Sequence, residues 1–255
     1  MIRQLLLVLL ISHIIADFAV RREVLGDKNG ARKSASWPHI TVFIGLNLLA
    51  FLCIALRNGS ISAVPWTVYS GLVVAIALFH WLIDRLFQRT RLWDAGKVGA
   101  RQRWLYVIQQ GIKIAFVLLT VGVVGTISVP VVPDVKPLAY MFGYTFSLFS
   151  GDAFVCLALT KLTWTSDKKV VSESVAGGGR LIGIFEALLV TTFVIAHQYT
   201  AIGVILAAKS LARFEWLKDH EGRAEYFLVG TLANLTWSAL GGLLALWFAG
   251  RPLFP

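Results

Sequence analysis

Charged residues are scarce in this 255-residue sequence: they make up only 15% of it, against about 25% in ordinary soluble domains. Hydrophobic residues make up 57%. A soluble globule of this size cannot cover so much apolar surface with so few charges. The composition therefore excludes a soluble enzyme, a disordered protein and a secreted disulfide scaffold, and it predicts a polytopic membrane protein.

Cysteine is also scarce, and the sequence has no phosphate-binding loop. Cys53 and Cys156 lie in apolar runs without any CxxC or Cys/His spacing, so they are predicted to be packing residues. No glycine-rich loop follows a strand pattern, which leaves nucleotide binding without support. Acidic residues are few as well, and the 24 Lys and Arg give a net charge of +10.

Long apolar runs dominate what is present, and a membrane-spanning helix needs about 20 mostly apolar residues. The first run carries His13 and Asp17 and no clean cleavage pattern, so it is predicted to be an uncleaved span rather than a signal peptide. The predicted spans are 4–20, 38–57, 64–87, 104–128, 138–163, 180–198 and 225–249. A shorter run at 199–214 is predicted to cross at a tilt or to re-enter. The expected fold class is an all-α polytopic membrane helix bundle of about seven to eight inserted segments.

Most of the basic residues fall in alternate loops, at 21–37, 85–103, 161–180 and 209–223. Because Lys and Arg accumulate in cytoplasmic loops, these segments are predicted to face the cytoplasm and both termini the outside. We expect a bacterial cytoplasmic (inner) membrane protein whose basic loops contact anionic lipids. The charge does not predict nucleic-acid binding, since no soluble domain presents a basic face. A protein partner or a homo-oligomer stays open.

The segment 166–179, which ends in three glycines, is the predicted linker. It divides the chain into an N-terminal block of five spans (1–165) and a C-terminal block (180–255) of two spans plus the short segment.

Polar side chains inside the apolar runs are the main functional signal, because a charge in hydrocarbon costs about 2.5–3.5 kcal/mol. The first and third spans each carry a His followed four residues later by an Asp, which puts both on one helix face. Another His opens the second span, and Gln and Lys residues lie early in the fourth. The alternating span directions place all of them at one depth near the cytoplasmic end. These candidate site residues are His13, Asp17, His39, His80, Asp84, Gln109 and Lys113.

Imidazoles and carboxylates are ligands for Zn, Mn or Fe, and an Asp can act as a base toward bound water. The predicted ligands of a divalent metal are His13, Asp17, His39, His80 and Asp84. Asp17, Asp84 and Lys113 are the candidate catalytic groups. The alternative is that each Asp bonds the His of its own turn and a neighbouring helix, and only holds the bundle together.

A second polar set lies in the C-terminal block. Glu186 lies inside the sixth span, Lys209 and Arg213 end the short run, and Glu225 begins the last span. The basic residues are four apart and can pair with either glutamate across helices, since an unpaired buried charge would be far worse. The simplest interpretation is that such pairs hold the three segments together.

At these residues the chain resembles a bacterial membrane-protein family known only as domain of unknown function 3307. Its signature Leu-x-x-His-x-x-x-Asp-Phe is matched by the stretch from Ser12 to Phe18, and its His-x3-Asp by His80 to Asp84. Its Asp-Gln-x-x-His motif corresponds to the stretch from Gln109 to Lys113, where Gln and Lys replace the acid and the histidine. The C-terminal extension of longer members is similar from Gly179 to about Leu244.

The resemblance implies metal binding through its His/Asp pattern but no established activity. Lys113 departs from the pattern, because a fixed positive charge repels a cation; it can instead pair with Asp17 or Asp84 and replace the ion. Three hypotheses follow: a membrane enzyme, metal-assisted and acting on an amphiphilic substrate; a transporter or channel for a small solute or ion, with Glu186, Lys209 and Glu225 on a deeper path; and a non-catalytic membrane partner or sensor.

Overall fold

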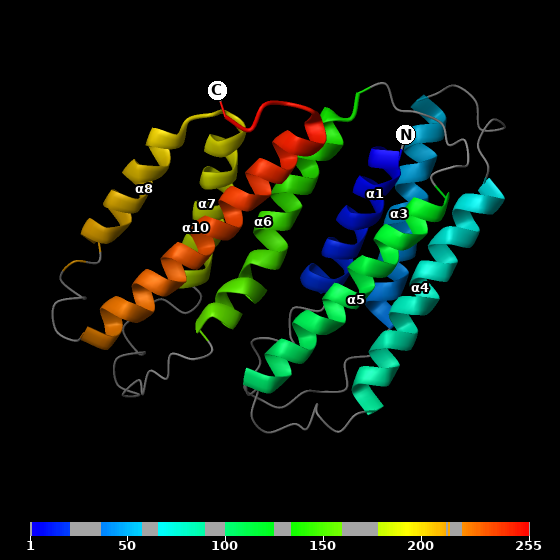
Figure 1. Ribbon diagram of the computed structural model, residues 1–255, viewed down its shortest axis with the longest axis horizontal. Coiled ribbons are helices and arrows are strands. Elements are labelled where there is room, and N and C mark those ends of the chain that lie inside the picture. The colour runs from blue at the N-terminus through cyan, green and yellow to red at the C-terminus, as the bar shows by residue number, and fades with distance from the viewer. Residues whose placement is uncertain are drawn as a thin grey trace. The chain divides into compact units, whose positions relative to one another are not determined.

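The computed structural model describes residues 2–20, 37–57, 66–89, 100–124, 134–159, 178–212, 214 and 221–254. Within these ranges all regular structure is helical (Figure 1), as the sequence predicts. In chain order the elements are α1 (Ile2–Ile14), the π-helix η1 (Ile15–Val20), α3 (Trp37–Arg57), α4 (Trp66–Arg89), α5 (Ala100–Val124), α6 (Lys136–Ala158), α7 (Gly178–Ile195), α8 (Tyr199–Ala212) and α10 (Glu221–Ala249).

Five of these helices, α4, α5, α6, α7 and α10, are long and apolar enough to cross a membrane. There are also two shorter apolar helical stretches, Pro38–Cys53 in α3 and Tyr199–Ala212 in α8. These lengths and compositions are those of a helical membrane protein. The 14 residues of α8 extend over about 21 Å, less than the roughly 30 Å of a hydrocarbon core.

Most residues of the four basic loops lie outside the described residues, and so does the predicted linker up to residue 177. The orientation derived from the loop charges therefore stays a prediction. Gly178 and Gly179, the last residues of that linker, already belong to α7.

The chain forms two compact units, Met1–Leu138 and Ala139–Pro255. This division differs from the predicted blocks, because α6 belongs with the C-terminal helices and not with the preceding four spans. The reason lies in side-chain packing that a hydropathy pattern does not contain: Gly143 and Ser147 of α6 lie directly against Gly241 of α10.

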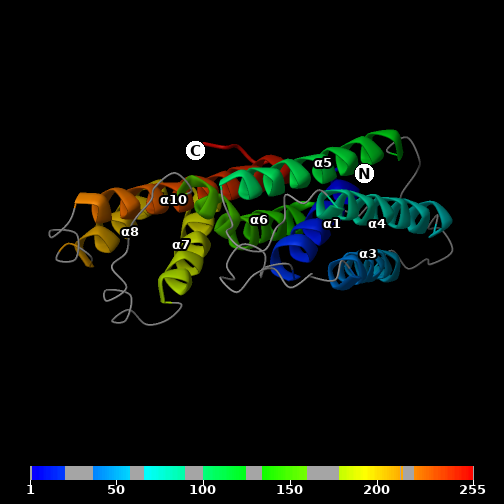
Figure 2. The ribbon, with the colours of Figure 1, turned by 90° about the horizontal axis from the view of Figure 1, so that it is seen from below.

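The N-terminal unit is a closed bundle in which α1 packs against α3 and α5, and α4 packs against the same two helices. Figure 2 shows α3 and α5 on opposite sides of α1 and α4. Aliphatic side chains fill the interior, including Leu7, Leu9, Ile76 and Val117, none of which is measurably exposed. The polar residues described below interrupt this apolar interior.

The C-terminal unit is built on close contact of α10 with α6 and α7. A Cβ atom added to Gly241 would lie 2.1 Å from the Ser147 hydroxyl, and one added to Gly242 would lie 2.6 Å from Val194. Only glycine permits this approach, as in other membrane helix pairs with small residues at the contact.

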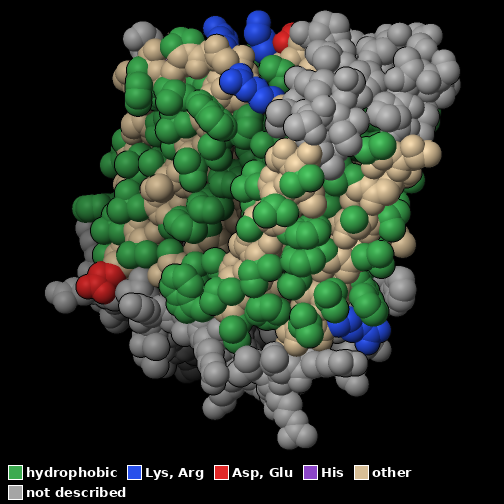
Figure 3. Space-filling model, turned by 45° about the vertical axis from the view of Figure 1, so that its right-hand side comes forward, with side chains coloured by type: hydrophobic (Ala, Val, Ile, Leu, Met, Phe, Trp, Pro, Cys, Tyr) green, Lys and Arg blue, Asp and Glu red, His purple; other side chains and the backbone are tan. Residues whose placement is uncertain are grey.

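Large apolar side chains remain exposed on the membrane-length helices, among them Leu78, Leu119, Val123 and Phe185, each more than 60% exposed. Figure 3 shows one face of the molecule covered mainly by hydrophobic side chains. On a soluble protein such a surface would be an aggregation hazard. On a membrane protein it is the lipid-facing surface.

Candidate functional site

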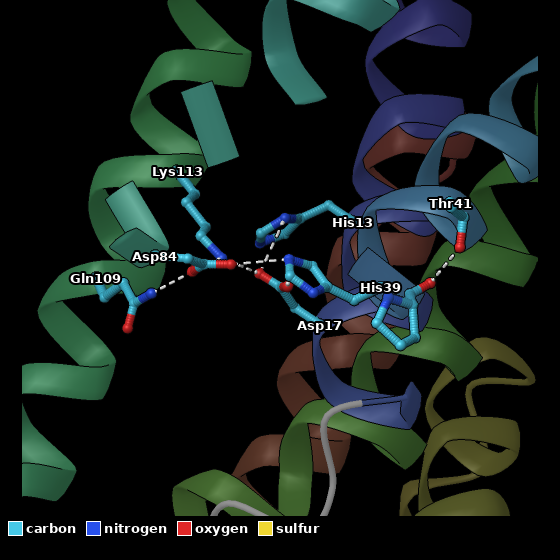
Figure 4. A network of polar contacts seen from close by, with 8 residues as sticks. His13, Asp17, His39, Thr41, Asp84, Gln109 and Lys113 are labelled. Carbon is cyan, nitrogen blue, oxygen red and sulfur yellow. Dashed lines mark hydrogen bonds and ion pairs between the residues drawn. The ribbon is translucent and has the colours of Figure 1, made fainter. Parts of the chain in front are cut away.

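Four segments of the N-terminal unit bring the polar residues together. His13 is the penultimate residue of α1, and Asp17 follows in the π-helix η1. His39 is the third residue of α3, and Asp84 lies near the opposite end of α4 in sequence. Because neighbouring helices run in opposite directions, these positions reach the same level of the bundle, where Lys113 of α5 meets them (Figure 4).

Lys113 is the centre of this arrangement. Its Nζ atom lies 2.8 Å from Asp17 Oδ2 and 2.9 Å from Asp84 Oδ1. All three side chains are at most 1% exposed. One ammonium group therefore bridges two carboxylates from different helices. A buried charge needs such opposite charges beside it, because an unpaired charge is very costly in a low-dielectric interior.

His39 and Gln109 complete the surroundings of the carboxylates. His39 Nε2 lies 2.8 Å from Asp84 Oδ2 and 3.7 Å from Asp17 Oδ1. The Gln109 side-chain amide donates a hydrogen bond to Asp84 Oδ1. Asp84 thus receives contacts from α3 and α5 as well as from the ammonium. These groups, with Lys113 and Asp17, form what we call the charge cluster.

The two remaining histidines form a separate part of the site. The rings of His13 and His80 have centroids 4.9 Å apart, and the ring of Phe43 lies 5.1 Å from that of His80. His13 Nδ1 lies 3.7 Å from Asp17 Oδ2, which is too far for a hydrogen bond. Both ring nitrogens of His13 and Nε2 of His80 are buried without a hydrogen-bond partner among the described residues.

Gln110 repeats this pattern, since both atoms of its side-chain amide are buried and have no hydrogen-bond partner in the described part of the chain. Buried polar groups in native proteins are nearly always satisfied by protein or by water. The unsatisfied nitrogens of His13 and His80 beside Asp17 therefore leave capacity to bind a small polar group.

The alternative from the sequence, in which each Asp bonds the His of its own turn, does not describe the shortest contact of Asp17. Asp17 contacts Lys113 at hydrogen-bond distance, whereas its own-turn His13 is more distant. The π-helical turn at Ile15–Val20 contributes to this, because i→i+5 bonding rotates Asp17 away from the position that a continuous α-helix would give it.

A divalent metal is the cofactor that the sequence predicts. They contain no group of three His, Cys, Asp or Glu side chains arranged to hold a metal ion. The Lys113 ammonium lies where a cation between the two carboxylates would lie. With Lys113 in this position the donor set does not fit a metal, so metal binding stays a prediction that requires this lysine to move.

The second predicted set is only partly brought together. Lys209 Nζ lies 2.6 Å from Glu186 Oε2, and the Asn234 amide donates to the same oxygen at 3.3 Å. Glu225 is exposed at the start of α10 and does not join them. Arg213 lies outside the described residues.

Several polar contacts between helices were not predicted from the sequence, among them the following three. Arg180 of α7 pairs with Asp152 of α6 at 2.9 Å, on an exposed surface. The Tyr69 hydroxyl donates to the Asn47 carbonyl at 3.1 Å and joins α3 to α4. Thr191 donates to the Ser147 hydroxyl at 2.8 Å, and thereby joins α7 to α6. For the ion pair of Arg180 with Asp152, the only indication in the sequence was an aspartate inside an apolar run, since such a charge needs a partner.

The comparisons with known proteins give one match. Residues 5–136 match the model of a protein family described as "Protein of unknown function (DUF3307)". The match runs from the first turn of α1 to the first residue of α6 and includes every residue of the charge cluster. Neither the curated proteins nor the solved structures include one with significant similarity to the chain.

Proposed function

The chain belongs to the DUF3307 family, whose description carries no activity, and we propose from the site geometry that it is a membrane transporter for a small cation. The charge cluster in the N-terminal unit is the proposed binding centre. As the sequence predicts, the proposed location is a bacterial cytoplasmic membrane, with basic loops against anionic lipids.

One observation carries this proposal: a fully buried pair of aspartates already holds a tethered cation. Asp17, Asp84 and Lys113 are at most 1% exposed, and the surrounding His and Gln side chains at most 5%. A guest that enters such a centre is the size of an ion or a water molecule. An amphiphilic enzyme substrate would have to bring its reacting bond to an aspartate that has no exposed surface.

The charge of the cluster supports a cation as that guest. The two carboxylates outnumber the single ammonium by one in the interior of the bundle. An uncompensated charge is expensive in a low-dielectric interior, so one further positive charge stabilises the centre. The free nitrogens of His13 and His80 next to Asp17 provide ligand atoms for it.

The Lys113 ammonium then competes with the entering cation for the two carboxylates. An entering cation displaces the ammonium from one carboxylate, and departure of the cation lets the ammonium return. Such an exchange takes the two carboxylates and the ammonium from one excess negative charge to one excess positive charge when a divalent cation enters, so the centre stays close to balance in both states and binding is reversible, which transport requires. Imidazole ligands suit Zn²⁺ and Fe²⁺, and carboxylates suit Mn²⁺, so the metals predicted from the sequence become the candidate cargo.

Uptake into proteoliposomes tests this proposal. The full chain is reconstituted, and accumulation of Zn²⁺, Mn²⁺ and Fe²⁺ is followed with ion-sensitive dyes inside the vesicles. Asp84→Asn is expected to lower the initial rate at least about tenfold, because it removes one of two carboxylates from the centre. Asp152→Asn removes an exposed carboxylate far from the cluster in sequence and is expected to leave the rate unchanged.

Uptake that is equal in Asp84→Asn and in the wild type would contradict the proposal, and so would the absence of uptake for all three ions. Absence of uptake for all three ions would favour a non-catalytic membrane partner. One observation supports that alternative. Lys113 and His39 connect α3, η1, α4 and α5 directly, so the cluster can hold the bundle together without any guest.

A further inference from the structure

Gln110 of α5 is a buried polar residue to which the function proposed above assigns no role. Its side chain is 5% exposed, and both atoms of its amide are buried without a hydrogen-bond partner among the described residues. An unpaired buried amide costs stability, and an apolar side chain of similar size would avoid that cost. A residue of this kind is therefore expected to make its hydrogen bonds in another state of the protein.

The helix register places Gln110 beside Lys113. Gln109 and Gln110 precede the lysine by four and three residues in α5. At about 3.6 residues per turn, they lie on opposite sides of Lys113, at about 40° and about 60° around the helix axis. Long side chains on a helix point back toward its N-terminus and cover the positions three and four residues earlier. The lysine side chain can therefore lie toward either glutamine.

In the structure, the ammonium of Lys113 shares an acceptor with Gln109. Lys113 Nζ and the Gln109 amide both contact Asp84 Oδ1, and Lys113 Nζ also contacts Asp17 Oδ2 (Figure 4). An ammonium carries one more N–H donor than these contacts with two carboxylates use. On the other side of the lysine, the Gln110 amide oxygen is an acceptor that no described residue uses.

Rotation of the lysine side chain alone can bring its ammonium to Gln110. Cβ atoms three residues apart on a helix are separated by about 5–6 Å, and the lysine side chain is a long, flexible stem. A cation that displaces the ammonium from one carboxylate leaves an N–H donor of Lys113 without an acceptor in the buried interior, at a high cost. The Gln110 oxygen can accept from that donor, because it lies within one turn of the same helix and has no partner among the described residues.

We propose that Gln110 is a positioning residue for Lys113, an inference that rests on the proposed function. When a cation takes one carboxylate, Lys113 keeps its contact with the other carboxylate and donates to the Gln110 oxygen in place of the lost one. When the cation leaves, the ammonium returns and the Gln110 amide is unpaired again. Gln110 thus stabilises the cation-bound state and sets the cation affinity of the charge cluster without contacting the cation.

Gln110→Met in the full chain tests this role, since methionine has a side chain of similar length and no amide. In proteoliposomes, the KM for uptake of the transported ion among Zn²⁺, Mn²⁺ and Fe²⁺ is expected to rise about tenfold, because the displaced ammonium loses its acceptor. The maximal rate is not expected to fall, since both carboxylates remain. Thr120→Val, in the same helix, removes a hydroxyl that donates to carbonyl groups of α5 itself, and is expected to leave the KM unchanged.

The melting temperature separates this role from a purely structural one. Replacement of an unpaired buried amide by an apolar side chain of similar shape is neutral or stabilising. Without a cation, Gln110→Met is therefore expected to melt at or above the temperature of the wild type. If Gln110 only held the bundle together, the melting temperature and the transport rate would fall together.

The effect must also act through Lys113. In a Lys113→Met background, the further change Gln110→Met is expected to leave the KM unchanged, because no ammonium then needs an acceptor. If Lys113→Met does not fold, the single variant and its Thr120→Val control still decide the matter.

An unchanged KM in Gln110→Met, or a melting temperature that falls together with the rate, overturns the role of Gln110 and leaves the proposed function standing. Absence of uptake in the wild type contradicts the proposed function itself, and the role of Gln110 is then overturned with it.

Discussion

At the scale of single residues, the centre of the N-terminal unit depends on one lysine that bridges two aspartates. Lys113 lies between the two carboxylates and reaches both Asp17 and Asp84. A neutral side chain at position 113 would leave two buried carboxylates, and a second cation would have to enter. The identity of this residue therefore decides whether the centre is compensated from within or by an ion.

The first prediction at this scale is that Lys113→Met lowers the free energy of unfolding by about 3–5 kcal/mol, because it leaves the two aspartates without their counter-charge. Thermal or denaturant unfolding in detergent measures the loss. Lys136→Met, at an exposed position at the start of α6, is the matched control and is expected to change stability by less than about 0.5 kcal/mol.

Addition of Asp17→Asn to Lys113→Met should recover part of the lost stability, since one of the uncompensated charges disappears. If Lys113→Met alone is as stable as the wild type, the ammonium does not carry the compensation. In that case the cluster takes up protons or ions from solution.

Sequence reasoning located these residues well but could not assign their contacts. The alternation of span directions was enough to place His13, Asp17, His39 and Asp84 at one level, because that level depends only on how far each residue lies from a span end. Which donor meets which acceptor depends on helix rotation and rotamers. For that reason Lys113, rather than the nearest His in sequence, is the partner of Asp17.

At the scale of elements, apolar runs identify helices but not their neighbours. The spans predicted at 64–87 and 104–128 correspond to α4 and α5, and the short run at 199–214 corresponds to α8. The π-helix that follows α1 and the grouping of α6 with the C-terminal unit have no hydropathy signal. The glycines of α10 were a usable signal for close packing, although the pattern did not name the partner helix.

The second prediction concerns that packing. Gly241→Ala is expected to destabilise the C-terminal unit by about 1–3 kcal/mol, because the new methyl group overlaps the Ser147 hydroxyl and lies 2.9 Å from the Gly143 carbonyl oxygen. Gly203→Ala in α8 meets no atom within 4 Å and is expected to be neutral or stabilising by up to about 1 kcal/mol. Melting temperatures of the two variants give the comparison, and equal values would show that α6 and α10 can separate without loss.

At the scale of the whole molecule, the structure shows which helices can span a membrane, whereas their orientation in the membrane is predicted from the charges of the loops. The five membrane-length helices have the same lengths and compositions whichever way the chain is inserted. Orientation follows from Lys and Arg in the alternate loops, most of which lie outside the described residues. Sidedness also decides from which compartment an ion reaches the charge cluster, so it bears on both proposals.

The third prediction tests this orientation. In a background with Cys53→Ala and Cys156→Ala, a cysteine introduced by Pro252→Cys, at an exposed position after α10, is expected to react with a membrane-impermeant maleimide in intact bacterial cells. Lys97→Cys, in the basic segment 85–103, is expected to react only after the membrane is opened, because Lys and Arg are retained on the cytoplasmic side. Both must react in denaturant, which shows that each cysteine is present and reduced. The reverse pattern in intact cells would mean that the charge cluster lies near the outer side of the membrane, and an ion that binds there would be taken up from that side first.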